Sequence, residues 1–144
     1  MKQENQKPEV VVGVMIFKGK KVLIGKRRNT STHGQGEYSF PGGRLEHMEG
    51  FEEGVKRETF EEAGIKIKNI KFQCLINIDI YKPKHIILIG LTATWKSGKP
   101  QSFENERIGD WNWYDMNNFP EPIFPPTDFL VKSYKTGQNY FDLK

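Results

Sequence analysis

The stretch of sequence that decides the fold is Gly43–Ile65, which reads GRLEHMEGFEEGVKRETFEEAGI. Apolar or small side chains recur at every fourth position along its second half, which is the spacing of one helix face. These positions are Phe51, Val55, Thr59 and Ala63. Gly64 follows directly, and glycine commonly ends helices because it adopts left-handed backbone angles at no steric cost. The pattern therefore predicts a helix over residues 49–63.

Three carboxylates, those of Glu58, Glu61 and Glu62, share one face of this predicted helix. At ~100° per residue they occupy an arc of roughly 100°. Glu58 and Glu62 are four residues apart, where like charges repel. A hard divalent cation such as Mg²⁺ would relieve this repulsion, because it prefers carboxylate oxygens as ligands. The alternative is a solvated acidic face with no metal.

The charge distribution favours the cation. Seven of the chain's 18 acidic residues lie between Glu46 and Glu62, although the 22 lysines and arginines give a net charge of +4. A local group of acids in a mildly basic chain is typical of a cation site next to a polyanion site.

The same stretch resembles the Nudix box, written GX5EX7REUXEEXGU. All seven fixed identities stand at the required spacing: Gly43, Glu49, Arg57, Glu58, Glu61, Glu62 and Gly64. At ~6% usage per residue type, such a match arises by chance in on the order of one window in 10⁸ to 10⁹. The one departure is Thr59, where the pattern has a bulky aliphatic residue.

The resemblance to the Nudix family extends over about residues 10–135. Tyr38–Gly43, YSFPGG, resembles the aromatic-x-x-Pro-Gly-Gly segment of MutT-like nucleoside triphosphate diphosphatases. The segments 104–107, ENER, and 111–114, WNWY, resemble the acidic loop and the tryptophan-rich strand of small members. The resemblance implies an α+β fold, an α/β/α sandwich with a mixed sheet and a loop-helix-loop catalytic motif.

The resemblance also implies a reaction and a metal site. Nudix hydrolases cleave a nucleoside diphosphate linked to another moiety, with Mg²⁺, for which Mn²⁺ can substitute. By position, the metal ligands would be the backbone carbonyl of Gly42 and the carboxylates of Glu58, Glu61 and Glu62. Arg57 and Glu49 would form the pair that braces the helix. Glu49 would also be able to reach a metal.

Further site residues are expected outside the box. Glu104 is the candidate for an additional carboxylate, as metal ligand or general base, and Glu106 is the alternative two residues away. Arg27 and Arg28 are candidates for binding the terminal phosphates of a substrate. Phe40, or alternatively Phe103, is a candidate for stacking on its base.

The substrate is left open by the resemblance. The short length and the MutT-like segment favour a nucleoside triphosphate, canonical or oxidised, cleaved to the monophosphate and pyrophosphate. Tyr81 stands where diadenosine polyphosphate hydrolases of this family tend to carry a tyrosine, and Pro83 is close to where ADP-ribose hydrolases carry a proline. Nucleotide sugars and RNA caps are further candidate substrates, and a non-catalytic nucleotide-binding role is also open.

The rest of the chain has the composition of one domain, residues 1–144, with its core at about 10–135. Strands are expected at 10–17, 22–25, 38–40, 65–80, 85–95 and 111–114, and a second helix from 125 to about 134. The histidines, His33, His47 and His85, lack metal-ligand spacing and are expected at the surface. Trp111 and Trp113 are expected to pack in the core, and Cys74 to be buried.

The composition also predicts a protein of the cytoplasm. One cysteine forms no internal disulfide, and the longest apolar stretch, Ile86–Leu91, is too short to span a bilayer. Residues 1–9 are polar and lack the apolar segment of a signal peptide. The partner expected is a small nucleotide, with no stable nucleic-acid partner because the lysines are scattered along the chain. A homodimer is left open.

Overall fold

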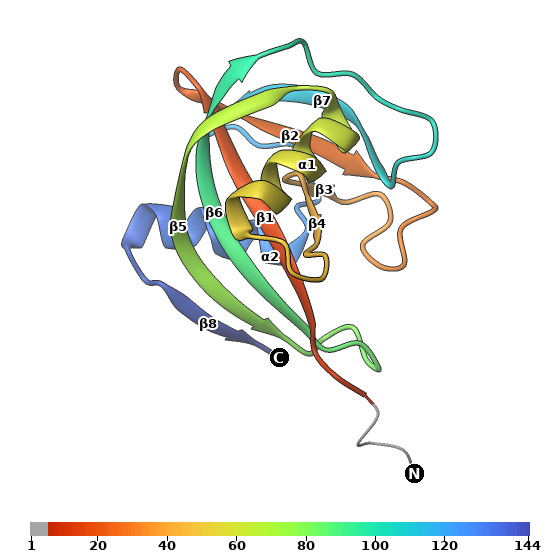
Figure 1. Ribbon diagram of the computed structural model, residues 1–144. Helices are drawn as coiled ribbons and strands as arrows, with labels where there is room; N and C mark the ends of the chain where they lie inside the picture. Colours follow the sequence, from red (N-terminus) through yellow and green to blue (C-terminus); the bar gives the residue numbers. More distant parts are fainter. Residues whose placement is uncertain (1–5) are drawn as a thin grey trace.

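The computed structural model describes residues 6–144, so residues 1–5 of the polar N-terminal stretch lie outside the described residues. These residues form eight strands and two helices (Figure 1). They are β1 Glu9–Lys18, β2 Lys21–Arg27, β3 Tyr38–Ser39, β4 Gly42–Arg44, α1 Phe51–Ala63, β5 Lys66–Ile78, β6 Ile86–Ser97, β7 Ile108–Asp115, α2 Pro125–Thr136 and β8 Tyr140–Leu143.

All eight strands join one mixed sheet in the order β3-β2-β1-β6-β5-β8, with β4 paired to β1 and β7 paired to β2. The central pair, β1 and β6, is parallel from Glu9 opposite Ile86 to Phe17 opposite Thr94. Strands β5 and β6 are antiparallel, and β8 adds a parallel edge to β5. The expected α+β architecture with a mixed sheet is confirmed.

The two helices cover opposite faces of the sheet, α1 in front and α2 behind in Figure 1. Side chains alternate along β1, so Val12, Val14 and Ile16 pack in one apolar cluster with Val55 of α1. Met15 points the other way, into a second cluster that α2 closes with residues such as Leu130. The sandwich therefore has two cores, one on each side of the sheet.

The ends of α1 agree with the sequence pattern to within two residues. Gly64 adopts φ 74° and caps the C-terminus, as expected. The helix begins at Phe51 and not at Glu49, because the Glu49 carboxylate accepts a hydrogen bond from the Glu46 backbone N–H at 2.9 Å and holds a turn there. The Glu53 carboxylate accepts the N–H of Gly50, the residue that precedes the helix, at 3.3 Å.

Two strands were not expected. Strand β4 has the sequence Gly-Gly-Arg, which carries no strand propensity, and it forms only because β1 supplies a partner for its backbone. Strand β8 is four residues long and is held in the same way by β5. Within residues 6–144, no helix is both long and apolar enough to cross a membrane.

Candidate active site

An ion pair between Arg57 and Glu49 fixes α1 to the loop that precedes it. The Arg57 guanidinium donates to both oxygens of Glu49, from Nε to Oε2 at 2.7 Å and from Nη2 to Oε1 at 3.0 Å. Nη2 also donates to the backbone carbonyl of Arg44 in β4 at 3.0 Å. These hydrogen bonds from Arg57 lower the pKa of Glu49 to about 2, so the pair is ionised at neutral pH.

Arg57 also contacts two of the candidate metal ligands. Its Nη1 donates to Glu58 Oε2 at 3.2 Å and to Glu61 Oε1 at 3.1 Å. Glu61 is about half exposed, whereas Glu58 is largely covered. One guanidinium therefore lies among three of the box carboxylates and orients them.

The third candidate ligand, Glu62, is buried at 2% exposure. Its Oε1 accepts the backbone N–H of Gly42 at 2.9 Å, which ties α1 to the start of β4. Burial raises the pKa of Glu62 well above its usual value, although this hydrogen bond opposes the shift, and the negative charge of Glu58 adds to the rise. Burial likewise raises the pKa of Glu58.

The glycines beside these carboxylates leave room for them. A Cβ built on Gly43 would overlap the carboxyl carbon and both oxygens of Glu58. A Cβ on Gly42 would overlap the backbone carbonyl of Val12 in β1. The strand β4 therefore passes so close to α1 and β1 that side chains are excluded at both positions.

These residues suit Mg²⁺ by donor type. Among residues 6–144, no three His, Cys, Asp or Glu side chains are already arranged to hold a metal ion. Glu58 and Glu61 instead share the Arg57 guanidinium, each through one oxygen, and the second oxygen of each makes no hydrogen bond to Arg57. The side-chain donors are all carboxylates, two of them disfavoured as anions by burial, and a hard divalent cation stabilises such a set.

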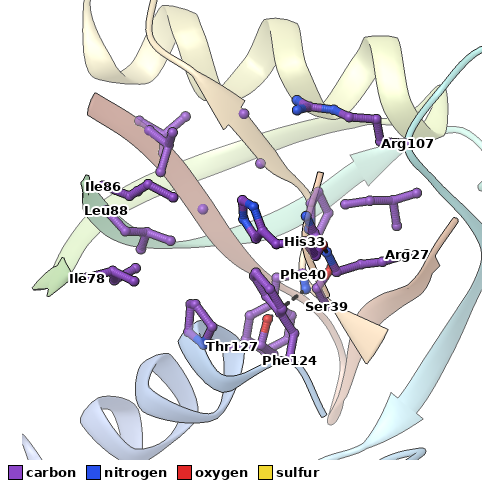
Figure 2. Close-up of a pocket in the computed structure, with 18 of the residues that line it drawn as sticks. Arg27, His33, Ser39, Phe40, Ile78, Ile86, Leu88, Arg107, Phe124 and Thr127 are labelled. Atoms are coloured by element: carbon purple, nitrogen blue, oxygen red, sulfur yellow. Dashed lines mark hydrogen bonds between the residues drawn. The ribbon is translucent and has the colours of Figure 1, made fainter. Parts of the chain in front are cut away.

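A cleft opens beside this carboxylate group (Figure 2). Glu62, Gly42 and Gly43 line one part of it, next to Arg27 and Arg107. The opposite part is apolar, and Figure 2 shows its side chains across the cleft from the two arginines. They include Ile78, Ile86 and Leu88. The cleft thus joins a charged end to an apolar end.

Three aromatic rings stack between these ends. His33 lies on Tyr81 with ring centroids 4.1 Å apart, and on Phe124 with centroids 5.8 Å apart, and all three rings are within 22° of parallel. The Arg27 guanidinium lies over the Phe124 ring at 4.1 Å and donates from Nε to the His33 carbonyl at 3.1 Å. His33, expected at the surface, is half-buried and lines the cleft, whereas His47 and His85 are exposed as expected.

The three residues predicted to bind substrate, Arg27, Arg28 and Phe40, lie in different environments. Arg27 lines the cleft, as a phosphate ligand must. Arg28 is turned away, and its Nη1 donates to the backbone carbonyls of Phe103 and Glu106 at 2.6 and 3.1 Å. Phe40 borders the cleft but is only 5% exposed within the core, which leaves little ring surface for a base.

The acidic loop approaches the carboxylates through Glu106 and Arg107. Glu104 is exposed, and its backbone carbonyl accepts a hydrogen bond from Arg28 Nη1 at 3.5 Å. Glu106 is half-buried, and its charge raises the pKa of Glu62. The sequence did not indicate Arg107 or Phe124, because they come from two separate loops and match no short motif.

The aromatic stack predicts a pH effect on stability. Burial, followed by the positive charges of Arg27 and Lys84, lowers the pKa of His33 from 6.5 to about 4. The unfolded chain therefore takes up a proton between these values and the folded protein does not, so stability falls as the pH drops from 6.5 to 4.

His33→Phe keeps a stacked ring and removes the proton site. Urea unfolding at intervals between pH 7.5 and 4.5 should show a shallower decline for this variant than for the wild type. The slopes of the free energy of unfolding against pH should differ by less than ~1.4 kcal/mol per pH unit, the value for one fully buried group. Equal slopes for the two proteins would contradict the assignment of His33.

The sequence is similar to that of known proteins. The NUDIX domain family matches residues 7–133. The chain is 32% identical over 128 residues to the NAD-capped RNA hydrolase NudC of Mannheimia succiniciproducens, covering 88% of this chain and 45% of that protein. The chain therefore spans about half the length of the curated relatives it matches.

Solved structures agree on the fold. A MutT NUDIX hydrolase from Burkholderia pseudomallei superposes with a TM-score of 0.81 at 26% identity, covering 89% of this chain and 98% of that one. A MutT protein from Bacillus halodurans superposes with a TM-score of 0.73 at 23% identity, covering 92% of this chain and 86% of that one.

Proposed function

This chain belongs to the Nudix hydrolase family, and we propose that it hydrolyses a nucleoside triphosphate to the monophosphate and pyrophosphate in the presence of Mg²⁺. The observation that carries the proposal is that one cleft, which Glu62 of the carboxylate helix lines, also holds two arginines and a stack of aromatic rings. Residues whose chemistry matches a metal, a polyphosphate and a base therefore lie in or beside one cleft.

The metal would be held by Glu58, Glu61 and Glu62 of α1 together with the Gly42 carbonyl. When bound, Mg²⁺ neutralises charge on the pyrophosphate and lowers the pKa of a bound water. Arg57, paired with Glu49, holds the helix against β4 so that the three carboxylates keep their mutual positions. Mn²⁺, with the same preference for carboxylate oxygens, is expected to substitute.

The phosphates would lie against Arg27 and Arg107. Burial lowers the pKa of Arg27, and the positive charge of Arg107 lowers it further, so the two guanidinium groups repel each other. A polyphosphate chain between them relieves that repulsion and gains charge-assisted hydrogen bonds. Arg28 would act indirectly, by holding the 103–106 loop through its backbone carbonyls.

The additional carboxylate would come from that same loop. Glu106 is half-buried and close enough to Glu62 to affect its pKa, while Glu104 extends into solvent. Either reaches an attacking water only in the presence of substrate and metal. The base would contact the stacked rings of His33, Tyr81 and Phe124, with Phe40 forming part of the cleft wall beneath them.

A second candidate is a dinucleotide substrate, such as the NAD cap that the NudC relatives are named for. The observation in its favour is that Tyr81 lines the cleft and stacks on His33. Pro83, the residue that pointed to ADP-ribose, is exposed in the turn between β5 and β6.

The substrate is tested by product analysis with Mg²⁺ on canonical and oxidised nucleoside triphosphates, ADP-ribose, NAD, diadenosine polyphosphates and nucleotide sugars. The expected result is a monophosphate plus pyrophosphate from triphosphates, with kcat/KM at least tenfold above that for any dinucleotide. Exclusive cleavage of dinucleotides would replace the first candidate by the second. Metal binding without turnover of any compound would favour a non-catalytic nucleotide-binding role.

A further inference from the structure

A second groove lies outside the catalytic cleft, and all three tryptophans of the chain line it. It is open to solvent and has a volume of about 470 Å³. Trp111 forms its buried wall, and its indole N–H donates to the Glu62 backbone carbonyl at 3.1 Å. Trp95 and Trp113 are partly exposed, so portions of both rings face solvent in this groove.

The pairing of strands explains why these rings meet. Trp95 lies on β6 opposite the buried Ile67, and Trp113 lies on β7 opposite the buried Leu23, so both rings project from the α1 face of the sheet. The Trp95 indole N–H donates to the Gly98 carbonyl at 2.8 Å, which fixes the ring against the β6–β7 connection. The groove is thus part of the rigid sheet and not of a loop alone.

Lysines surround the two rings. Lys18 lies with its Nζ 4.3 Å from the Trp95 ring centroid and 5.6 Å from that of Trp113. Lys99 lines the groove, and Lys21 is paired with Lys18 across the β1–β2 hairpin. All three side chains belong to exposed residues, and Asp115 lies opposite Lys21 on β7.

Lysines that are scattered in the sequence therefore gather at one end of the sheet. The hairpin contributes Lys18, Lys20 and Lys21, and the end of β6 and the connection after it contribute Lys96 and Lys99. The separation of these residues along the chain, by more than 70 positions, is why the sequence alone predicted no basic nucleic-acid surface.

We propose that this groove binds a single-stranded nucleic acid. Base stacking on aromatic rings combined with lysine contacts to phosphates is the usual mode of such binding, and it requires both features in one place. On binding, the Lys18 ammonium would move from the indole rings to a phosphate and leave the ring faces to the bases. An acidic peptide would satisfy the lysines but not the two tryptophan faces.

Because every tryptophan lines this groove, intrinsic tryptophan fluorescence reports on it directly. The full chain, in EDTA so that no hydrolysis occurs, is titrated with a 12-nucleotide oligo(dT) or oligo(U). Saturable quenching is expected at low salt. If about three phosphates are contacted, the logarithm of the binding constant should fall with a slope of about −2 against the logarithm of salt concentration.

The charge variant Lys18→Glu with Lys99→Glu should weaken oligonucleotide binding at least tenfold. Its matched control, Lys132→Glu with Lys135→Glu on α2, makes the same charge change on the opposite face and should alter binding less than twofold. Lys99→Glu alone, at an exposed residue, should give an intermediate loss, and circular dichroism checks that each variant is folded.

Three results would overturn the proposal. These are no saturable quenching up to about 100 µM oligonucleotide at low salt, an equal loss of binding in both double variants, and equal quenching by poly-glutamate. None of them bears on triphosphate hydrolysis, which is measured separately with Mg²⁺ and is expected to be unchanged in the Lys18 and Lys99 variants.

Discussion

Glu61→Gln is expected to lower kcat for the preferred substrate roughly 10³-fold. This loss corresponds to the several kcal/mol that a catalytic metal supplies. The substitution removes one negative charge from the proposed metal site and little else. Glu61 is about half exposed, and a glutamine carbonyl still accepts the hydrogen bond that Arg57 Nη1 now donates at 3.1 Å. The free energy of unfolding should therefore change by less than about 0.5 kcal/mol, the usual range for exposed positions.

The matched control is Glu52→Gln, which makes the same change on the same helix. Glu52 is exposed in the first turn of α1 and pairs only with Lys56, at 3.3 Å, among the described residues. Its kcat should stay within twofold of wild type. The measurement is steady-state hydrolysis over a range of Mg²⁺ concentrations, together with thermal unfolding of each variant. Turnover within threefold of wild type for Glu61→Gln would exclude Glu61 from the metal site.

Some parts of the fold and of the candidate site could be predicted from the sequence and others could not. The difference is whether the interacting residues are close together along the chain. The helix, its Gly64 end and its line of carboxylates were predictable, because spacing along one element decides which side chains share a face. The pairing of Arg57 with Glu49 was also expected, from the resemblance of these positions to the Nudix box. These features depend on neighbours in sequence.

The walls of the cleft depend instead on contacts between distant segments. His33, Tyr81 and Phe124 come from three connections, which follow β2, follow β5 and precede α2, and their rings meet only in the folded chain. The composition of each connection predicts a loop and nothing about its neighbours. Arg28 illustrates the same limit. Its place in the sequence, beside Arg27, suggested a phosphate ligand, whereas its guanidinium contacts a loop more than 70 residues away.

The proposed site has a half that holds the metal and a half that holds the base, and the two should tolerate substitutions to different degrees. The metal half is built on α1 and β4, where each of the three carboxylates accepts a hydrogen bond through one oxygen, from a backbone N–H or from Arg57. The base half is built on connections, where ring stacking fixes orientation less strictly. Small displacements at the metal half should therefore cost more activity than substitutions among the rings.

Gly43→Ala tests that difference at the tightest contact. The added Cβ would overlap the Glu58 carboxyl, so either the carboxylate or strand β4 must move. A displacement of about 1 Å at a catalytic group lowers turnover roughly 10²-fold. Overpacking of a tight contact costs about 1–3 kcal/mol of stability. We expect both effects, together with a higher Mg²⁺ concentration for half-maximal rate.

The control for this substitution is Gly50→Ala in the same motif. A Cβ on Gly50 meets no atom within 4 Å, and its φ of −75° suits alanine. The loss of stability should stay below about 1 kcal/mol, because Gly50 only precedes the first turn of α1. Activity should stay within threefold of wild type. If the Gly43 variant matched the Gly50 variant in rate, stability and Mg²⁺ dependence, the position of Glu58 against β4 would have no bearing on catalysis. A loss confined to the Gly43 variant would place the Glu58 carboxylate among the groups whose position the reaction requires.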